Sequence, residues 1–408
     1  MAKILISSLG IGQKEEGTYR QTKYSIDGKE YTTAFIADAL CQHLGIEKLF
    51  LVGTNKSIWD EAYAAFGGTD ENYQFELMDK KDEGQVDEAL LEVFNKQVSD
   101  KLNVEGSKAS LVSYGIDDDE LWGIFEKYLE IAENIEDGDE LYLDITHSFR
   151  SLAMMSLVMT QFASSISDKK FTLKGVYYGM VEYISESEDK VAPIVNLNIL
   201  FELQEWIKAI DAIKKYSDFD PLVEILEKEG MDDNVAKAFI HLNNAIDMGN
   251  MASMQSFVKS AGKKIRAISD SDNKVIKLLA TEVTTLVDEL NHEKMSDFQY
   301  ALAKWFYGNK NYAMSYMALA EGIITKACEI KGYDIKSREG REAAKDYMKI
   351  TKYDDDFSPK YANSISQIRN NIAHQLDSRG AGVDNDIKKL SYFIDRFKPF
   401  FLEENKNT

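Results

Sequence analysis

The clearest capacity for chemistry lies in a short run of polar residues: Thr146, His147, Ser148 and Arg150. An apolar segment that ends at Ile145 precedes the run, and a second apolar segment follows it directly. Hydroxyl, imidazole and guanidinium groups suit a phosphate, a ribose or a nucleobase. Taken one at a time, Thr146 and Ser148 are more simply explained as helix caps, and Arg150 as a solvated surface residue. Their clustering between a predicted strand and a predicted helix favours a ligand site.

A second polar loop follows the first apolar segment of the chain and contains Ser8, Gly10 and Gly12. A Gly-x-Gly turn lets backbone N–H groups approach a phosphate closely. The turn is not a dinucleotide fingerprint, because Glu15 stands where the third glycine would be required. A tight turn after a strand explains these glycines equally well. If both loops follow parallel strands of one sheet, they lie side by side at the edge where open α/β sheets bind ligands.

A third set of candidate residues lies near the C-terminus and consists of Arg369, Asn370 and His374. They occur in a predicted amphipathic helix over 358–377, in which Asn370 and His374 share one face because they are four residues apart. An RNA 2′-hydroxyl is an internal nucleophile beside its own phosphorus. His374 suits general acid or base catalysis, Arg369 suits a phosphate, and Asn370 could orient either group. This chemistry requires no metal, although an isolated Arg–His pair is more often a surface feature.

The elements that must position the first two sets of residues alternate between strand and helix. The pattern predicts a Rossmann-like α/β domain with a parallel-type sheet and helices on both faces. A hairpin is expected around Asp27-Gly28. Strands are expected over 4–9, 48–53, 74–78, 109–114, 140–145, 171–178 and 182–185. Helices are expected over 33–44, 57–66, 85–102, 120–134 and 150–165.

The pattern changes near residue 200, after which the chain reads as helical. Asp220-Pro221 and Ser358-Pro359 each combine an N-cap residue with a proline at the first helical position. The prediction is therefore an α/β domain over 1–199 and an all-α domain over 200–408. A helix over about 200–216 would connect them.

Composition limits the classes of function. A chain of 408 residues favours two domains. The net charge of −21 argues against a duplex-DNA binder. Two cysteines, Cys41 and Cys328, provide no disulfide framework and no Cys-x-x-Cys metal spacing, and the five histidines are scattered. Neither a metal nor a cofactor is therefore expected. No segment resembles a signal peptide or a membrane span, and a cytoplasmic location is expected.

Two motifs resemble one known family. The heptapeptide Asp-Ile-Thr-His-Ser-Phe-Arg, over 144–150, resembles the signature of CARF domains in the CRISPR-associated CARF–HEPN ribonucleases of type III systems. The run that begins at Arg369 and ends at His374 is similar to the Arg–x4–His motif of HEPN domains, and it stands in the expected C-terminal position. The resemblance implies a CARF domain followed by a helical HEPN domain.

The resemblance also implies a function. The chain would be a metal-independent endoribonuclease for single-stranded RNA in antiviral defence, activated allosterically by cyclic oligoadenylate, with the tetra-adenylate favoured and the hexa-adenylate next. Some CARF domains also cleave their ligand slowly. By analogy, the ligand contacts are Ser8, Gly10, Gly12, Thr146, His147, Ser148 and Arg150. The catalytic residues are Arg369, Asn370 and His374.

The same resemblance predicts a homodimer, or a higher oligomer, with composite catalytic sites. The apolar stripe Ile365, Ile368 and Ile372 would then lie in or beside the interface. Other functions remain open. The chain could be a nucleotide sensor with a catalytically silent helical domain, a small-molecule enzyme working in the α/β domain, or a structural accessory.

Overall fold

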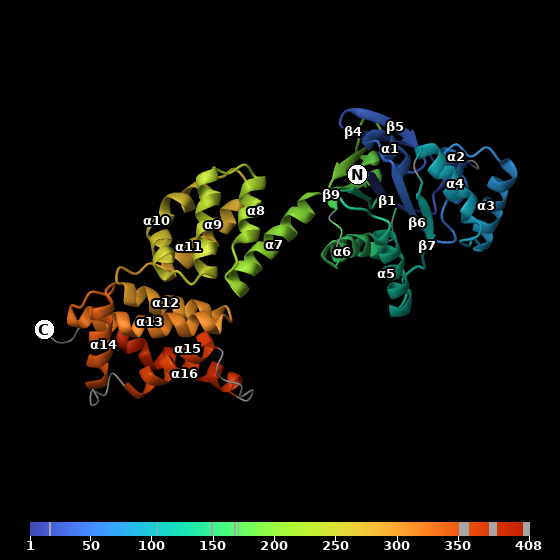
Figure 1. Ribbon diagram of the computed structural model, residues 1–408. Coiled ribbons are helices and arrows are strands. Elements are labelled where there is room, and N and C mark those ends of the chain that lie inside the picture. The colour runs from blue at the N-terminus through green and yellow to red at the C-terminus, as the bar shows by residue number, and fades with distance from the viewer. Residues whose placement is uncertain are drawn as a thin grey trace. The chain divides into compact units, whose positions relative to one another are not determined.

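The computed structural model describes residues 1–15, 18–103, 105–147, 150–166, 169, 171–350, 359–374 and 382–402 (Figure 1). The chain divides into two compact units, Met1–Leu200 and Phe201–Thr408. The first unit is built on a sheet and the second on helices (Figure 1). The combination of an α/β unit followed by a mostly helical unit agrees with the fold class expected from the sequence.

The first unit contains an eight-stranded sheet in the order β5-β4-β10-β9-β8-β1-β6-β7. Strands β9, β8, β1, β6 and β7 run parallel, whereas β10 is antiparallel to β9 and β4 is antiparallel to β5. The bounds are β1 Lys3–Leu9, β4 Thr22–Ile26, β5 Lys29–Thr33, β6 Lys48–Gly53, β7 Lys108–Leu111, β8 Glu140–Asp144, β9 Thr172–Gly179 and β10 Ala192–Asn196. A separate two-stranded ribbon joins β2 (Lys14–Glu15) to β3 (Thr18–Tyr19).

The order of the parallel strands creates a topological switch point between β1 and β8. From β1 the chain builds β6 and β7 on one side, then returns to add β8 and β9 on the other side. The chain therefore leaves the carboxyl ends of β1 and β8 toward opposite faces of the sheet, and ligands of open α/β sheets bind at such a switch point. The polar loops that the sequence singled out follow these two strands.

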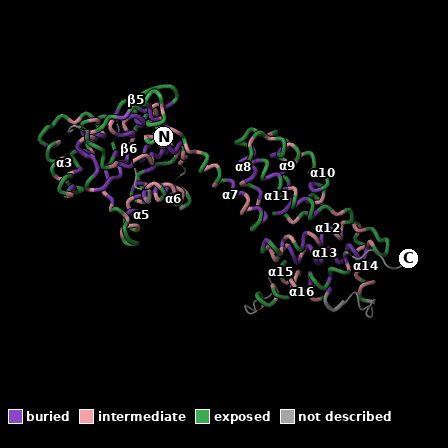
Figure 2. The backbone as a smooth tube through the Cα atoms, turned by 180° about the vertical axis from the view of Figure 1, so that it is seen from behind, coloured by how far each residue is buried: buried purple, intermediate pink, exposed green. Residues whose placement is uncertain are grey.

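Helices cover both faces of the sheet, as the alternation of the sequence predicted. Leu5 and Leu51 pack with α1 (Ile36–Leu44), α2 (Trp59–Ala65), α3 (Glu71–Glu83) and α4 (Leu91–Leu102). Ile6 and Leu141 point to the other face, toward α5 (Asp118–Glu133) and α6 (Arg150–Ile166). Successive strand residues alternate between the faces, so both layers bury apolar surface. Figure 2 shows the backbone around β6 as mostly buried, whereas β5 at the edge of the sheet is mostly exposed.

The predicted hairpin around Asp27-Gly28 is confirmed. β4 pairs with β5 in a register that sets Ile26 opposite Lys29, which leaves a two-residue loop. Asp27 and Gly28 have φ values of 49° and 74°, in the left-handed region that such a turn requires.

The strand expected over 74–78 is wrong, because this segment lies inside helix α3. The side chain of Asp70 accepts hydrogen bonds from the amides of Asn72 and Tyr73 and so caps the helix. Tyr73, Leu77 and Lys81 are buried at a spacing of four residues, which is the period of a helix face. Gly84 ends the helix in the left-handed conformation. A short apolar run fits a strand and one turn of a helix equally well, so the sequence of this segment did not distinguish the two.

Two other expected elements also differ. The helix predicted over 85–102 begins only at Leu91, because the amide of Gln85 closes the end of α3 on the carbonyl of Lys80. The segment expected as a strand over 182–185 is a 3-10 helix, η1 (Val181–Ser185). Amide-to-carbonyl bonds three residues apart, from Tyr183 to Met180 and from Glu186 to Tyr183, form this helix in the connection between β9 and β10.

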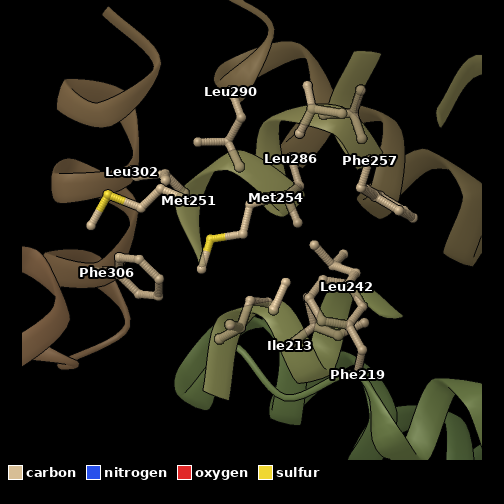
Figure 3. Close-up of a cluster of buried hydrophobic side chains, with 14 of the residues drawn as sticks. Ile213, Phe219, Leu242, Met251, Met254, Phe257, Leu286, Leu290, Leu302 and Phe306 are labelled. Atoms are coloured by element: carbon tan, nitrogen blue, oxygen red, sulfur yellow. The ribbon is translucent and has the colours of Figure 1, made fainter. Parts of the chain in front are cut away.

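The second unit is helical wherever the structure describes it. Its helices are α7 Ile199–Tyr216, α8 Asp220–Lys228, α9 Asp233–Asp247, α10 Met251–Ser269, α11 Lys274–Leu290, α12 Met295–Gly308, α13 Tyr312–Lys331, α14 Arg338–Ile350, α15 Pro359–His374 and α16 Val383–Leu402. One apolar core joins residues from α7 to α16. Figure 3 shows part of it, where Met254 and Phe257 of α10 face Leu286 of α11 and Leu242 of α9. No helix in the described ranges is long and apolar enough to span a membrane.

The apolar stripe of α15 packs largely into the core of its own unit. Ile365 is fully buried in the core of its own unit, and Ile368 packs against the same core. These two side chains therefore pack within the protomer, and the place of the stripe in or beside a dimer interface stays a prediction. Ile372 is more than one third exposed. The predicted extension of the helix to residue 377 lies outside the described residues.

Candidate functional site

The two polar loops of the first unit lie side by side at the switch point. Ser7 of β1 stands opposite Asp144 of β8 in the parallel register. Directly beyond the strands, Gly10 lies against His147, where a Cβ atom on the glycine would approach the His147 Cβ to 3.2 Å. Gly10 therefore allows the two loops to touch, and residues distant in sequence form one edge.

Asp144 forms the buried floor of this edge. Its carboxylate accepts hydrogen bonds from the Ser7 hydroxyl at 2.5 Å and from the Thr146 amide at 2.9 Å. Burial raises the pKa of Asp144, and the nearby His147 lowers it. Ser7 and Asp144 were not among the predicted site residues. The available signal was an acidic residue at the end of an apolar strand, since a carboxylate there needs nearby donors.

Thr146 connects the motif loop to the neighbouring strand. Its hydroxyl oxygen accepts a hydrogen bond from the amide of Gly179, the last residue of β9, at 2.8 Å. This bond satisfies a backbone donor where the β8–β9 ladder ends. Thr146 therefore has a structural role at the site, whether or not it also touches a ligand.

His147 lies against a tyrosine that the sequence did not indicate. The His147 Nε2 atom is 3.3 Å from the hydroxyl of Tyr24, which comes from β4 in the antiparallel part of the sheet. Burial lowers the pKa of His147, while the charges of Asp144 and Glu182 oppose that shift. A neutral imidazole presents one donor and one acceptor, which suits a nucleobase edge or a ribose hydroxyl better than an isolated phosphate.

Gly12 is required by packing as well as by backbone conformation. Its φ is +65°, and a Cβ atom would approach Ile58 Cγ2 to 2.7 Å and the ring of Tyr19 to 2.9 Å. The carbonyl of Gly10 also accepts a hydrogen bond from the amide of Ile58. These contacts anchor the glycine loop to the start of α2 and support the interpretation of a tight turn.

The remaining predicted ligand contacts are less exposed or not described. Ser8 is buried on the opposite face of β1 from Ser7, beside Tyr128 of α5 and Ser156 of α6. It therefore lies beneath the helices rather than at the edge of the loop. Ser148 and the side chain of Arg150 lie outside the described residues, although Arg150 is the first residue of α6.

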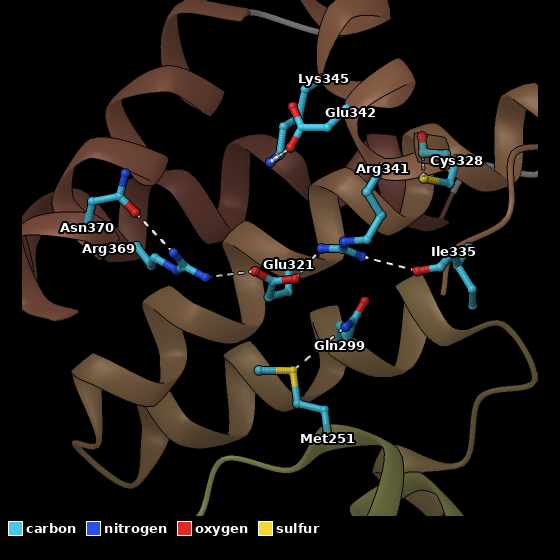
Figure 4. Close-up of polar contacts among 11 residues, drawn as sticks. Met251, Gln299, Glu321, Cys328, Ile335, Arg341, Glu342, Lys345, Arg369 and Asn370 are labelled. Carbon is cyan, nitrogen blue, oxygen red and sulfur yellow. Dashed lines mark hydrogen bonds and ion pairs between the residues drawn. The ribbon is translucent and has the colours of Figure 1, made fainter. Parts of the chain in front are cut away.

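The predicted catalytic residues lie on α15, beside a cavity of about 430 Å³. Arg369 donates one hydrogen bond to the Asn370 side chain and another to Glu321 of α13, both at 3.0 Å (Figure 4). Arg369 and Asn370 line the cavity. His374 is exposed at the last residue of the helix, one turn beyond Asn370, and is not among the residues that line the cavity.

Metal-binding residues are not clustered in the described part of the chain. Within these ranges, no group of three or more His, Cys, Asp or Glu side chains is arranged to hold a metal ion.

Comparisons with known proteins match both units. Residues 4–182 match the family described as the CARF domain of the CRISPR system endoribonuclease Csx1. Residues 202–296 match the second domain of the CRISPR-associated protein MJ1674. Both ranges end before Arg369.

A relative and a solved structure add to these matches. The CRISPR-associated protein MJ1674 of Methanocaldococcus jannaschii is 32% identical over 409 residues, which cover 92% of this chain and 62% of that protein. The chain thus spans less than two thirds of its relative. Csm6 of Enterococcus italicus, solved with cyclic hexa-2′-fluoro-hexa-dAMP, aligns over 98% of this chain and 93% of its own, with 14% identity and a TM-score of 0.44. The family match and the relative support one conclusion: the first unit is similar to CARF domains, and the chain as a whole is similar to a CRISPR-associated protein.

Proposed function

We propose that this protein is a metal-independent endoribonuclease for single-stranded RNA in type III CRISPR antiviral defence, and that cyclic oligoadenylate bound to the CARF domain activates it. The observation that carries the proposal is the arrangement on α15. Arg369 and Asn370 line a cavity, and His374 is exposed one helical turn away. The family that the first unit matches takes its name from an endoribonuclease, which supports the same reading.

The proposed reaction uses the RNA as its own nucleophile. The 2′-hydroxyl attacks the adjacent phosphorus, the P–O5′ bond breaks, and a 2′,3′-cyclic phosphate and a free 5′-hydroxyl result. His374 moves a proton on or off the reacting oxygens, since an imidazole can serve as a general acid or a general base. Arg369 stabilises the charge that develops on the phosphoryl oxygens. Asn370, which already contacts Arg369, holds the guanidinium in position.

The activator would bind where the β1 and β8 loops meet. The N-terminus of α6 and the polar groups around His147 suit the phosphates and bases of a small RNA ring. The tetra-adenylate is the preferred ring size and the hexa-adenylate the next. Activation requires that the ring bind more tightly to the active state than to the resting state. Helix α7, which begins at Ile199, is the candidate transmitter.

A homodimer is part of the proposal, and α6 supplies a surface for it. Met154, Val158 and Phe162 lie four residues apart along α6 and are 70%, 58% and 43% exposed. The ring of Phe162 contacts Phe125 of α5, which extends the apolar patch. Contiguous apolar patches on soluble proteins often mark interfaces. Because α6 starts at the motif, pairing two copies of this helix about a two-fold axis would bring two ligand sites toward one symmetric ring.

A single substitution that adds a negative charge to this patch tests the dimer. Val158→Glu is expected to convert the dimer to a monomer, because it would bury an unpaired carboxylate in the apolar contact. Sedimentation velocity measures the change in mass. The matched control is Phe75→Glu, an equally exposed apolar residue (61%) on α3. A Val158→Glu protein that remains dimeric would place the interface elsewhere.

A second candidate function is a nucleotide sensor with a catalytically silent helical domain. One observation favours it: Arg369 is engaged by Glu321, while His374 lies outside the cavity. In that case the helical unit would recruit a partner rather than cleave RNA.

One assay tests the proposed function. The purified protein is incubated with fluorescent single-stranded RNA and a chelator, and cyclic tri-, tetra- or hexa-adenylate is added in turn. One ring is expected to raise the rate of RNA cleavage far above the basal rate measured without a ring, whereas duplex DNA in a parallel reaction should stay intact. Chromatography of the ring shows whether it is slowly cleaved. Intact RNA with every ring, despite measurable ring binding, would favour the silent sensor.

A further inference from the structure

The cavity beside Arg369 is formed by three helices and is strongly basic. Of the described residues that line it, Arg341, Lys345, Lys349 and Arg369 are cationic, and Glu321 alone is acidic. The protein as a whole carries a net charge of −21. The rest of the lining consists of Ala320, Ile323, Ile324, Met348, Ala362, Asn363, Ser366 and Asn370. A concentration of positive charge in an acidic protein indicates an anionic ligand.

Helix α14 presents these cations in register. Arg341, Lys345 and Lys349 are spaced by four residues, so they lie along one face of the helix that borders the cavity. Successive members are about 6 Å apart along the axis, at 1.5 Å per residue. Phosphates along an extended single strand follow one another at a similar distance. The row of cations therefore suits the backbone of a single-stranded nucleic acid better than it suits one isolated anion.

Glu321 holds the centre of the cavity. Its carboxylate accepts a hydrogen bond from Arg369 at 3.0 Å and pairs with Arg341 through its other oxygen. Figure 4 shows the two guanidinium groups approaching it from opposite sides. A guanidinium group binds a carboxylate and a phosphate in the same way, by donating two parallel hydrogen bonds to a pair of oxygens. The carboxylate therefore occupies a position that a phosphate could take.

The two lysines have partners that are easily exchanged. Lys345 pairs with Glu342 and Lys349 with Asp346, both at 2.9 Å and both three residues away on the exposed side of α14. Exposed ion pairs of this kind contribute little to stability, because water screens them. A polyanion in the cavity can therefore replace these partners.

We propose that the α14 face is the RNA backbone site of this protein, and that Glu321 stands in for a phosphate until RNA binds. Lys345 and Lys349 hold phosphates that flank the one at Arg369. RNA entry exchanges the Glu321 carboxylate for a phosphate between Arg341 and Arg369. This inference rests on the proposed ribonuclease function and assigns its substrate contacts. It also explains why Arg369 is paired within the protomer when no RNA is bound.

RNA affinity tests the lysines. The binding of fluorescent single-stranded RNA is measured by anisotropy across a series of salt concentrations, in a His374→Ala background that keeps the RNA intact. Adding Lys345→Ala and Lys349→Ala is expected to weaken binding roughly tenfold or more at low salt. It should also reduce the slope of log affinity against log salt by about 1.4, since each phosphate contact contributes about 0.7. Lys304→Ala, an exposed lysine of α12 outside the cavity, is the matched control and should change neither value.

Glu321→Gln tests the exchange. A neutral amide no longer competes with phosphate for the two guanidinium groups, so RNA affinity is expected to rise roughly threefold or more. Unchanged or weaker binding would overturn the role of Glu321 as the displaced anion. An unchanged thermal midpoint in each variant shows that the fold is intact.

The outcomes separate the inference from the proposed function. If the parent protein cleaves RNA and the double lysine variant binds RNA with unaltered affinity and salt slope, the α14 site is wrong while the ribonuclease proposal stands. If the parent protein neither binds nor cleaves RNA with any ring present, both proposals fall.

Discussion

His374→Ala is expected to abolish ring-activated RNA cleavage, with a fall in rate of about 10²- to 10⁴-fold, because proton transfer by a positioned imidazole contributes that much to such reactions. Affinity for the cyclic oligoadenylate should not change, since the proposed ligand site belongs to the other unit. Cleavage is followed by the release of a fluorescent RNA fragment, and ring binding by calorimetry. His241→Ala, another exposed histidine of the helical unit, is the matched control and should remain active.

Arg369→Ala should reduce cleavage by a comparable factor, because it removes a preorganised charge from the phosphate. Arg369 also pairs with Glu321, so its removal could disturb the cavity. Arg369→Lys separates these effects: it keeps a cation beside Glu321 but loses the planar, two-point contact with phosphate. An intermediate rate with an unchanged thermal midpoint is expected for the lysine variant. Full cleavage by both His374→Ala and Arg369→Ala would contradict the assigned site.

Arg150→Ala is expected to raise the ring concentration needed for half-maximal activation by about 10- to 100-fold. A hydrogen bond to a charged group contributes about 1.5–3 kcal/mol, and each 1.4 kcal/mol is a factor of ten. We expect Arg150 to contact a phosphate of the ring because it is the first residue of α6, next to the switch point. The N–H groups at the start of a helix also favour phosphate there. Basal cleavage without the ring should stay the same.

The control for Arg150 is Lys29→Ala, which removes one positive charge from β5, at the far edge of the same sheet. Its activation curve should superimpose on that of the unmodified protein. If Arg150→Ala also leaves the activation curve in place, the ring binds elsewhere and the analogy with the CARF signature fails at that residue.

The alternation of elements in the first unit was readable because buried parallel strands are continuous apolar runs with helices between them. β1, β6 and β8 all follow this rule. The errors fell on short segments. The segments 74–78 and 182–185 are only five and four residues long, and such a short run fits a strand or one helical turn equally well. The cap at Asp70 and the end at Gly84 decided the first case, and the connection from β9 to β10 decided the second.

In the candidate site, too, some residues could be predicted from the sequence and others could not. The motif residues stood out through their types, since an imidazole and hydroxyls clustered after an apolar strand are informative in any fold. Their partners did not stand out. Tyr24 meets His147 only because β10 pairs with both β4 and β9, and Glu321 meets Arg369 only because α13 packs on α15.

By itself, the sequence determined the alternation of strands and helices in the first unit, the change from α/β to helix near residue 200, and the groups able to do chemistry, because these depend on local periodicity and residue type. Only the tertiary structure decided which groups meet. The Asp144 floor, the loop contact between Gly10 and His147, and the paired guanidinium groups on Glu321 join residues far apart in the chain. The physical reason is that strand register and helix packing minimise the free energy of the whole core, which no local window of sequence contains.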